Sequence, residues 1–167
     1  RAHAIIHRID TSKAEQHPGV LAVFTARDVP NNVYGLISPD QPVLCGPGSN
    51  REYADRVRFI GDQVAVVVAE TEAIAEEAVH LIDVEYEELP VITDPVIAMQ
   101  GEPLLHPDRG SNVFGHYRIR RGDVEQAFQQ AAVIVEGIYH TPEQEHAYLQ
   151  PEAGLGYMDE EGRVTVI

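Results

Sequence analysis

The central stretch of the chain, residues 56–90, reads RVRFIGDQVAVVVAETEAIAEEAVHLIDVEYEELP. Residues 64–69 (VAVVVA) are small or β-branched and apolar, which is typical of a strand buried on both faces. Thr71 is suited to cap a helix, with Glu72 in its first turn. Residues 84–88 alternate between apolar and acidic side chains, as a half-buried strand does. The stretch therefore predicts a strand–helix–strand unit that builds a core. The predicted helix has an apolar stripe made by Ile74, Ala75, Ala78, Leu81 and Ile82.

The residues before this unit predict two strands, a short helix and a long loop. Ser12 and Glu15 stand at capping-box spacing, and Pro18 ends the brief helix that they begin. The segment 31–55 is rich in Pro, Gly, Asn and Ser. Loops of this length often have a function or contact a partner. The other expected elements are a strand at 2–9, a buried strand at 20–25 and a single helical turn at 26–30.

The residues after the unit predict a second group of helices and strands. A Pro- and Gly-containing loop between residues 99 and 112 is the expected boundary between the two groups. The chain ends in RVTVI, an alternating strand start with no stop signal, so we expect the polypeptide to continue. The expected elements are helical turns at 94–99, a strand at 112–121, a helix at 123–131 capped by Asp123 and Gln126, strands at 133–140 and 146–158 (the latter interrupted at Pro151), and a hairpin turn at 159–162.

Composition excludes several classes of protein. The 167 residues are 44% hydrophobic and carry 12 Lys and Arg against 27 Asp and Glu, a net charge of −15. This balance argues against binding to nucleic acid or to an anionic membrane, because phosphate binding needs clustered basic residues. No apolar run approaches the roughly 20 residues of a membrane span. The single cysteine, Cys45, excludes an internal disulfide and any multi-cysteine metal site on this chain.

The eight histidines do not form an evident metal site. His3 and His7 are four residues apart, which on a strand separates them by about 13 Å. His140 and His146 could meet across a hairpin, but no third ligand accompanies them. We therefore expect ordinary surface or hydrogen-bonded histidines. The remaining, isolated ones are His17, His80, His106 and His116.

Other polar groups have a structural and a functional interpretation. Residues 143–146 (EQEH) could carry out acid–base chemistry, but a turn that satisfies backbone groups is the preferred interpretation. Three acidic residues of one strand are expected to form a solvated face: Glu85, Glu87 and Glu88. The only basic cluster could dock an acidic surface, but local ion pairing is preferred: Arg118, Arg120 and Arg121.

Cys45 and the glycines near it are expected to be structural. A nucleophilic cysteine needs a base and an electropositive setting, and the sequence identifies no base. Residues 46–49 (GPGS) lack the GK[ST] of a phosphate-binding loop. Gly35 and Gly61 are expected in turns.

Five phrases taken in series resemble a known family. The order and spacing are similar to the large, molybdopterin-binding subunit of the xanthine dehydrogenase/aldehyde oxidase family. The phrases are residues 18–30 (PGVLAVFTARDVP), 57–70 (VRFIGDQVAVVVAE), 84–90 (VEYEELP) followed by Asp94-Pro95, 122–128 (GDVEQAF), and 135–137 (VEG) with 145–149 (EHAYL) and 151–152 (PE).

The resemblance implies an α+β fold. Residues 1–105 would form an α/β hammerhead domain with mixed sheets and short helices. Residues 106–167 would begin the molybdenum-cofactor-binding domain, as a truncated strand–helix–strand–hairpin stub.

The resemblance also implies a parent enzyme in the cytoplasm. Such enzymes hydroxylate aldehydes or N-heterocycles such as purines with oxygen from water, using molybdenum–molybdopterin, and pass electrons to iron–sulfur clusters and FAD on other domains or subunits. The family's glycine-rich pterin segments and catalytic glutamate match nothing in this chain, and Gln150 stands where many relatives have Glu.

We therefore expect no catalytic, cofactor-binding or metal residue here, and an inactive, structural fragment. Strand edges exposed by truncation could pair between copies, so an oligomer is one possible state. One alternative is a non-catalytic scaffold or subunit-docking module that contacts partners through residues 31–55, and another is a small-molecule binding domain that uses the same loop.

Overall fold

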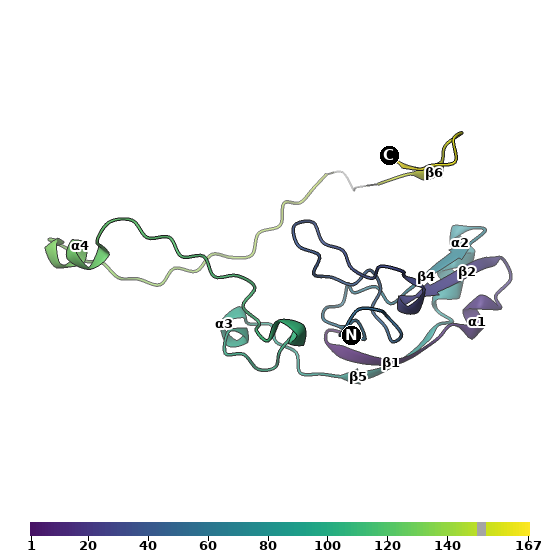
Figure 1. Cartoon of the computed structure of the whole chain (residues 1–167), viewed down its shortest axis with the longest axis horizontal. Coiled ribbons are helices and arrows are strands. Elements are labelled where there is room, and N and C mark those ends of the chain that lie inside the picture. The colour runs from purple at the N-terminus through teal and green to yellow at the C-terminus, as the bar shows by residue number, and fades with distance from the viewer. Residues whose placement is uncertain (150–152) are drawn as a thin grey trace. The chain divides into compact units, whose positions relative to one another are not determined.

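The computed structural model describes residues 1–149 and 153–167, which divide into two compact units. Unit 1 is Arg1–Arg118 and unit 2 is Ile119–Ile167. The elements of unit 1 are β1 (Ala4–Asp10), α1 (Ser12–Glu15), β2 (Val20–Thr25), the 3₁₀ turn η1 (Ala26–Asp28), β3 (Arg56–Val57), β4 (Ala65–Ala69), α2 (Glu72–Val79), β5 (Asp83–Glu88), α3 (Pro95–Ala98) and the 3₁₀ turn η2 (Pro107–Arg109) (Figure 1).

The first sheet of unit 1 has three antiparallel strands in the order β3–β1–β5. Strand β1 is central, and its register with β5 shifts between Ile6 and Arg8. The predicted alternation of β5 is confirmed: Val84 and Tyr86 pack against the core, whereas the acidic residues between them are exposed. The mixed helix and strand content confirms the predicted α+β class. The buried core consists of Ala4, Ile6, Ile9, Cys45 and Val57.

The second sheet is an antiparallel ribbon of β2 and β4, against which α2 packs. The predicted strand–helix–strand elements all form, but β4 and β5 belong to different sheets. The expectation that both faces of β2 and β4 are buried is wrong for the described residues. Phe24, Val66 and Val68 are 44%, 45% and 40% exposed. A ribbon of two strands presents two faces, and a single helix packed on it leaves one of them open.

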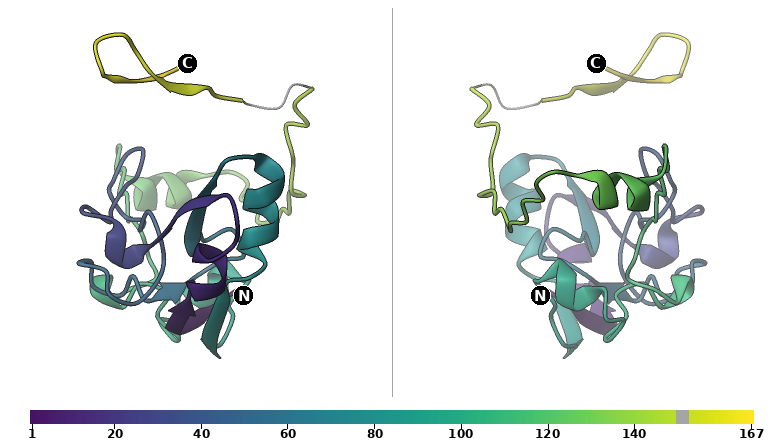
Figure 2. Two further views of the ribbon diagram at one scale, coloured as in Figure 1. Left: turned by 90° about the vertical axis from the view of Figure 1, so that its right-hand side faces the viewer. Right: turned by 90° about the vertical axis from the view of Figure 1, so that its left-hand side faces the viewer.

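The short helices begin where their side chains can bind free backbone N–H groups. Thr71 Oγ1 accepts from the Ile74 N–H at 3.3 Å, and Asp94 Oδ1 accepts from the Val96 N–H at 2.7 Å. The predicted pairing of Ser12 with Glu15 is wrong. Asp10 Oδ1 instead accepts from the Ser12 N–H at 3.1 Å, because Asp10 precedes the helix and its short side chain reaches the first turn. Helices α1 and α2 lie side by side (Figure 2).

The predicted long loop, residues 31–55, is organised around a buried asparagine. Asn32 is only 1% exposed. Its Nδ2 donates to the Leu44 carbonyl and to Ser49 Oγ, both at 2.8 Å. Its Oδ1 accepts from the N–H groups of Val43 at 2.8 Å and Leu44 at 3.0 Å. One amide therefore satisfies backbone groups that a loop cannot pair by itself.

Unit 2 contains one helix and one hairpin among its described residues. Helix α4 (Val124–Gln130) begins where Asp123 Oδ1 accepts from the Gln126 N–H at 3.0 Å, as the sequence predicts. Strand β6 (Gly156–Met158) pairs with β7 (Val164–Val166) through the predicted turn, in which Gly162 has a φ of 77°. Of the described residues in this unit, Asp159 and Thr165 are the ones that are not exposed.

Three predicted strands are wrong in whole or in part. Residues 112–121 and 133–140 form no strand, and of the strand expected at 146–158 only residues 156–158 pair. The reason is the lack of a partner: among the described residues, no second strand lies beside these apolar segments to form a ladder. The predicted interruption at Pro151 and the neighbouring Gln150 fall outside the described residues.

Candidate functional site

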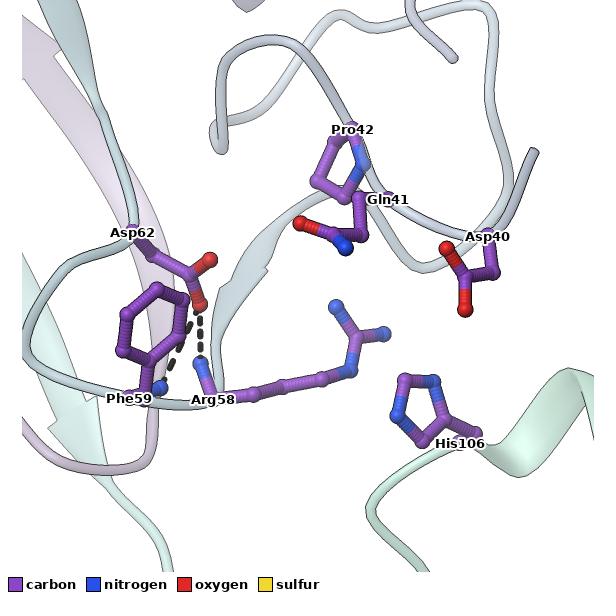
Figure 3. Close-up of a pocket in the computed structure, with 7 residues that line it drawn as sticks. All are labelled: Asp40, Gln41, Pro42, Arg58, Phe59, Asp62 and His106. Carbon is purple, nitrogen blue, oxygen red and sulfur yellow. Dashed lines mark hydrogen bonds between the residues drawn. The ribbon is translucent and has the colours of Figure 1, made fainter. Parts of the chain in front are cut away.

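A hollow of about 330 Å³ opens in unit 1 where the loop 31–55 and the turn after β3 meet residue 106 (Figure 3). It combines one cation, two carboxylates, an amide, an imidazole and an aromatic ring. The residues that line it are Asp40, Gln41, Pro42, Arg58, Phe59, Asp62 and His106.

Arg58 joins two distant segments at this hollow. Its Nε–H donates to the Leu105 carbonyl at 2.7 Å, and its Nη2 donates to the Tyr53 carbonyl at 3.1 Å. Burial lowers the pKa of Arg58 from its ordinary value, although a guanidinium keeps its charge. Its side chain extends between Gln41 and His106 (Figure 3). The Arg58 guanidinium thus binds two backbone carbonyl groups. No carboxylate oxygen of the described residues lies within ion-pair distance of it.

Asp62 fixes the backbone from which Arg58 projects. One carboxylate oxygen, Oδ2, accepts from the N–H groups of Arg58 at 2.5 Å and Phe59 at 3.3 Å (Figure 3). Gly61 completes this turn, as predicted, because a Cβ there would come within 2.2 Å of the Phe59 ring. The sequence RFIGD therefore encodes a closed turn that aims the arginine.

His106 and Asp40 form the opposite wall of the hollow. The pKa of His106 is lowered, first by burial and then by the positive charge of Arg58. The imidazole is therefore neutral near pH 7. The Asp40 carbonyl accepts from Arg51 Nη2 at 2.8 Å, which holds this part of the loop in place.

Asn112 fixes the segment that carries His106. Its Nδ2 donates to the carbonyls of Ala98 at 3.1 Å and Pro103 at 2.9 Å. Its Oδ1 accepts from the Leu105 N–H at 2.8 Å. Arg58 and Asn112 together turn the expected linker, residues 99–112, into an ordered part of unit 1.

Cys45 lies in the buried core of unit 1. It is buried, and burial, with the nearby Asp62 carboxylate, raises the pKa of its thiol to about 12. The thiol therefore stays protonated at neutral pH. Gly46 next to it would bring a Cβ within 2.7 Å of Ile9 Cδ1, so close packing requires a glycine there.

The structure scatters the other histidines. His3 is buried and its Nδ1–H donates to the Pro90 carbonyl at 2.7 Å, whereas His7 Nε2 lies 2.8 Å from Glu87. His146 is exposed and stacks on Tyr148, with ring centroids 5.5 Å apart. Within residues 1–149 and 153–167, no group of three or more His, Cys, Asp or Glu side chains is placed to hold a metal ion. Three further histidines are exposed: His80, His116 and His140.

The remaining candidates are surface groups. Residues 143–146 are exposed and form no turn, which contradicts the preferred interpretation; Glu145 accepts from the N–H of His146 at 2.9 Å. The acidic residues of β5 are exposed as expected and face cations: Arg1 lies 3.1 Å from Glu88. The local ion pairing expected for the three basic residues is wrong for the part of the chain that the structure describes, because they are exposed and make no ion pair there: Arg118, Arg120 and Arg121.

The hollow can bind a polar group but offers no reaction centre. The Asp40 carboxylate lies 4.0 Å from Arg109 Nη2 and is not hydrogen-bonded to the imidazole of His106, so the described residues show no base that activates a nucleophile. Sequence reasoning did not select Asn32, Arg58, Asp62 or Asn112. The available signal was weak: a polar residue that can bond backbone stands inside each Pro- and Gly-rich loop or turn.

The described residues between 105 and 167 do not fit molybdopterin by themselves. A pterin cofactor needs converging hydrogen-bond donors in an enclosed pocket. The described residues of unit 2 are almost all exposed, and none of their hydrogen bonds defines a buried cradle.

The geometry defines an α+β domain whose C-terminal segment is held by hydrogen bonds from Arg58 and Asn112. Two family models match the chain, one after the other along the sequence. Residues 1–90 match "Aldehyde oxidase and xanthine dehydrogenase, a/b hammerhead domain", and residues 105–167 match "Molybdopterin cofactor-binding domain". The chain belongs to the aldehyde oxidase and xanthine dehydrogenase family, which confirms the resemblance seen in the sequence.

Individual relatives agree with this assignment. A probable xanthine dehydrogenase subunit of Bacillus subtilis is 42% identical over 98% of this chain and 21% of its own length. The nicotinate dehydrogenase large molybdopterin subunit of Eubacterium barkeri is 37% identical over 99% of this chain and 37% of its own length. The structure of the aldehyde oxidoreductase from Desulfovibrio desulfuricans matches with a TM-score of 0.81 at 32% identity, over 99% of this chain and 19% of that one.

The chain thus spans 19% to 37% of the length of these relatives. The helices of the described residues include none that is long and apolar enough to cross a membrane.

Proposed function

We propose that this chain is a portion of a molybdenum hydroxylase large subunit and that its role there is structural. It supplies the hammerhead domain, residues 1–105, and the beginning of the cofactor domain, residues 106–167. The observation that carries the proposal is the succession of the two family models along one chain. The parent enzyme would hydroxylate aldehydes or N-heterocycles such as purines in the cytoplasm, with oxygen from water.

The ordered connection between the two parts supports a structural role. Arg58 and Asn112 bond the backbone of residues 98–105, so the hammerhead fixes where the next domain begins. Electrostatic and orienting effects in a catalytic site depend on such positioning. The chain therefore contributes to catalysis by positioning the start of the cofactor domain. The chain alone is inactive.

Molybdenum content and activity of two polypeptides test the proposal. The 167-residue chain and the longer subunit that contains it would be purified from the same host. We expect stoichiometric molybdenum and hydroxylation of an aldehyde, a purine or nicotinate, with a dye as electron acceptor, only for the longer subunit. Stoichiometric molybdenum in the 167-residue chain would contradict the structural role.

Docking of other subunits is a second candidate function, and one observation favours it. Leu36 and Ile37 are fully exposed at the tip of loop 31–55, between Tyr34 and Gln41, which pair with each other. Exposed apolar tips of this kind are typical of contact sites. The partners would be the iron–sulfur and FAD domains or subunits of the same enzyme.

A paired substitution tests docking separately from cofactor content. Leu36→Ser with Ile37→Ser should weaken co-purification with the iron–sulfur subunit and leave the molybdenum content unchanged. Ser38→Ala in the same loop is the matched control. Unchanged co-purification of the double variant would exclude this loop as a docking element.

A further inference from the structure

One face of the β2–β4 ribbon has no polar residue and no cover among the described residues. The pairs Phe24–Val66 and Ala22–Val68 are opposite each other across the ribbon. Cross-strand partners lie on the same side of a sheet, so these four residues share a face, here called the open ribbon face. Three of them are at least two-fifths exposed: Phe24, Val66 and Val68.

The opposite face of the same ribbon shows what covered positions look like. Val23 pairs with Val67 and Thr25 pairs with Ala65. These residues are buried or half-buried, and α2 packs against the ribbon. The two faces are therefore similarly apolar in sequence. They differ in that α2 packs against one face, whereas no described element packs against the other.

The composition of the open ribbon face is not that of a solvated strand. The chain carries a solvated strand face elsewhere, on β5, where Glu85 and Glu87 alternate with half-buried residues. On β2 and β4, by contrast, both faces are apolar. Continuous apolar strands are typical of sheets covered on both sides, and contiguous exposed apolar patches are typical of interaction sites.

We propose that the open ribbon face is a docking surface for an apolar segment of the remainder of the same large subunit. The inference rests on the proposed function. In the relatives that match nearly the whole chain, about four-fifths of the polypeptide lies outside the match, since the chain covers 21% of one and 19% of another. That polypeptide is covalently present at high effective concentration.

The chemistry of the face defines the occupant as aliphatic or aromatic. The four side chains offer neither a donor nor an acceptor, so a polar occupant would lose its bonds to water without replacement. Phe24 contributes the largest contact area and is expected to lie at the centre of the interface.

Footprinting with hydroxyl radicals measures the cover directly. Phe24 should be labelled readily in the 167-residue chain and severalfold less in the longer, molybdenum-loaded subunit. Phe59, which is exposed beside the hollow, reports general changes in unit 1.

A second measurement uses near-isosteric polar substitutions. Val66→Thr with Val68→Thr should lower the thermal midpoint of the longer subunit and leave that of the 167-residue chain unchanged, because a hydroxyl is costly only where it is buried. Val91→Thr, at an exposed position outside the ribbon, is the matched control and should change neither.

Three results would overturn the inference. Equal labelling of Phe24 in both polypeptides would show that the face stays open. Protection in the monomeric 167-residue chain would assign the cover to its own residues 119–167, and protection that grows with concentration alongside a doubled mass would assign it to a second copy. A longer subunit without molybdenum would refute the proposed function, whatever the labelling of Phe24.

Discussion

Replacing Asn32 by alanine should open the loop 31–55. The side chain is 1% exposed and makes four hydrogen bonds, of which three are with backbone groups of Val43 and Leu44. Leu44 is buried, and its N–H and carbonyl have no other partner among the described residues. The substitution therefore leaves a buried donor and a buried acceptor unsatisfied.

The magnitude follows from these two groups. A buried polar group left without a partner costs about 1–3 kcal/mol, so two of them cost about 2–6 kcal/mol. The Val43 N–H lies at a more exposed residue and can turn to water, which adds little. We expect a loss near the lower end, about 3 kcal/mol, because water can enter the space left by the amide.

Urea denaturation followed by far-ultraviolet circular dichroism measures this loss, since the chain has no tryptophan for fluorescence. Amide hydrogen exchange of Val43 and Leu44 measures it locally. Asn50→Ala is the matched control: Asn50 lies in the same loop but is exposed and donates one hydrogen bond, to Pro30. Its loss should stay below about 1 kcal/mol.

The comparison of the two variants can refute the reasoning. If Asn32→Ala and Asn50→Ala have the same urea midpoint, and if exchange at Val43 and Leu44 stays slow, the buried amide does not organise the loop. Faster exchange with an unchanged midpoint would instead mean that the loop opens without unfolding the sheet, and the estimate of the global loss would be wrong.

Three further predictions concern the helix cap, the arginine and the thiol. Thr71→Ala should destabilise the chain by about 1 kcal/mol in the same urea assay, because α2 loses its capping oxygen; an unchanged midpoint would refute the cap. Arg58→Lys should speed thermolysin cleavage near Leu105, since an ammonium cannot hold two carbonyls as the guanidinium does, whereas Arg27→Lys on an exposed side chain should not. The raised pKa of Cys45, about 12, means that its protonated thiol favours the folded state fully below its usual value of 9.0. This contribution is lost as the pH rises from there through about 12, so the stability difference between wild type and Cys45→Ala should shrink over that window, and a constant difference would contradict it.

Local rules were sufficient to predict the elements that depend on neighbours in sequence. Thr71 and Asp123 cap their helices as predicted, because capping involves residues two or three apart. The alternation of β5 also gave the correct face, since a half-buried strand has a period of two.

Elements that depend on distant partners were harder to predict. Residues 133–135 are as apolar as β4, yet residues 133–140 form no strand, because pairing requires a second strand beside them and none of the described residues supplies one. The hollow around Arg58 was not foreseen for a related reason. Its walls come from residues 40, 58 and 106, and no pattern in the sequence states that these approach one another.

The bonds from Arg58 to Leu105 and from Asn112 to Ala98 bear on how genes for such subunits can be divided. A break between codons 90 and 105 would leave the first polypeptide with a half-buried guanidinium whose partner, the Leu105 carbonyl, is encoded elsewhere, and a break between codons 105 and 112 would separate Asn112 from the Ala98 carbonyl. A break after codon 118 would leave both sets of bonds within one product. Gene fission or fusion should therefore be tolerated on the far side of Asn112 and selected against before it.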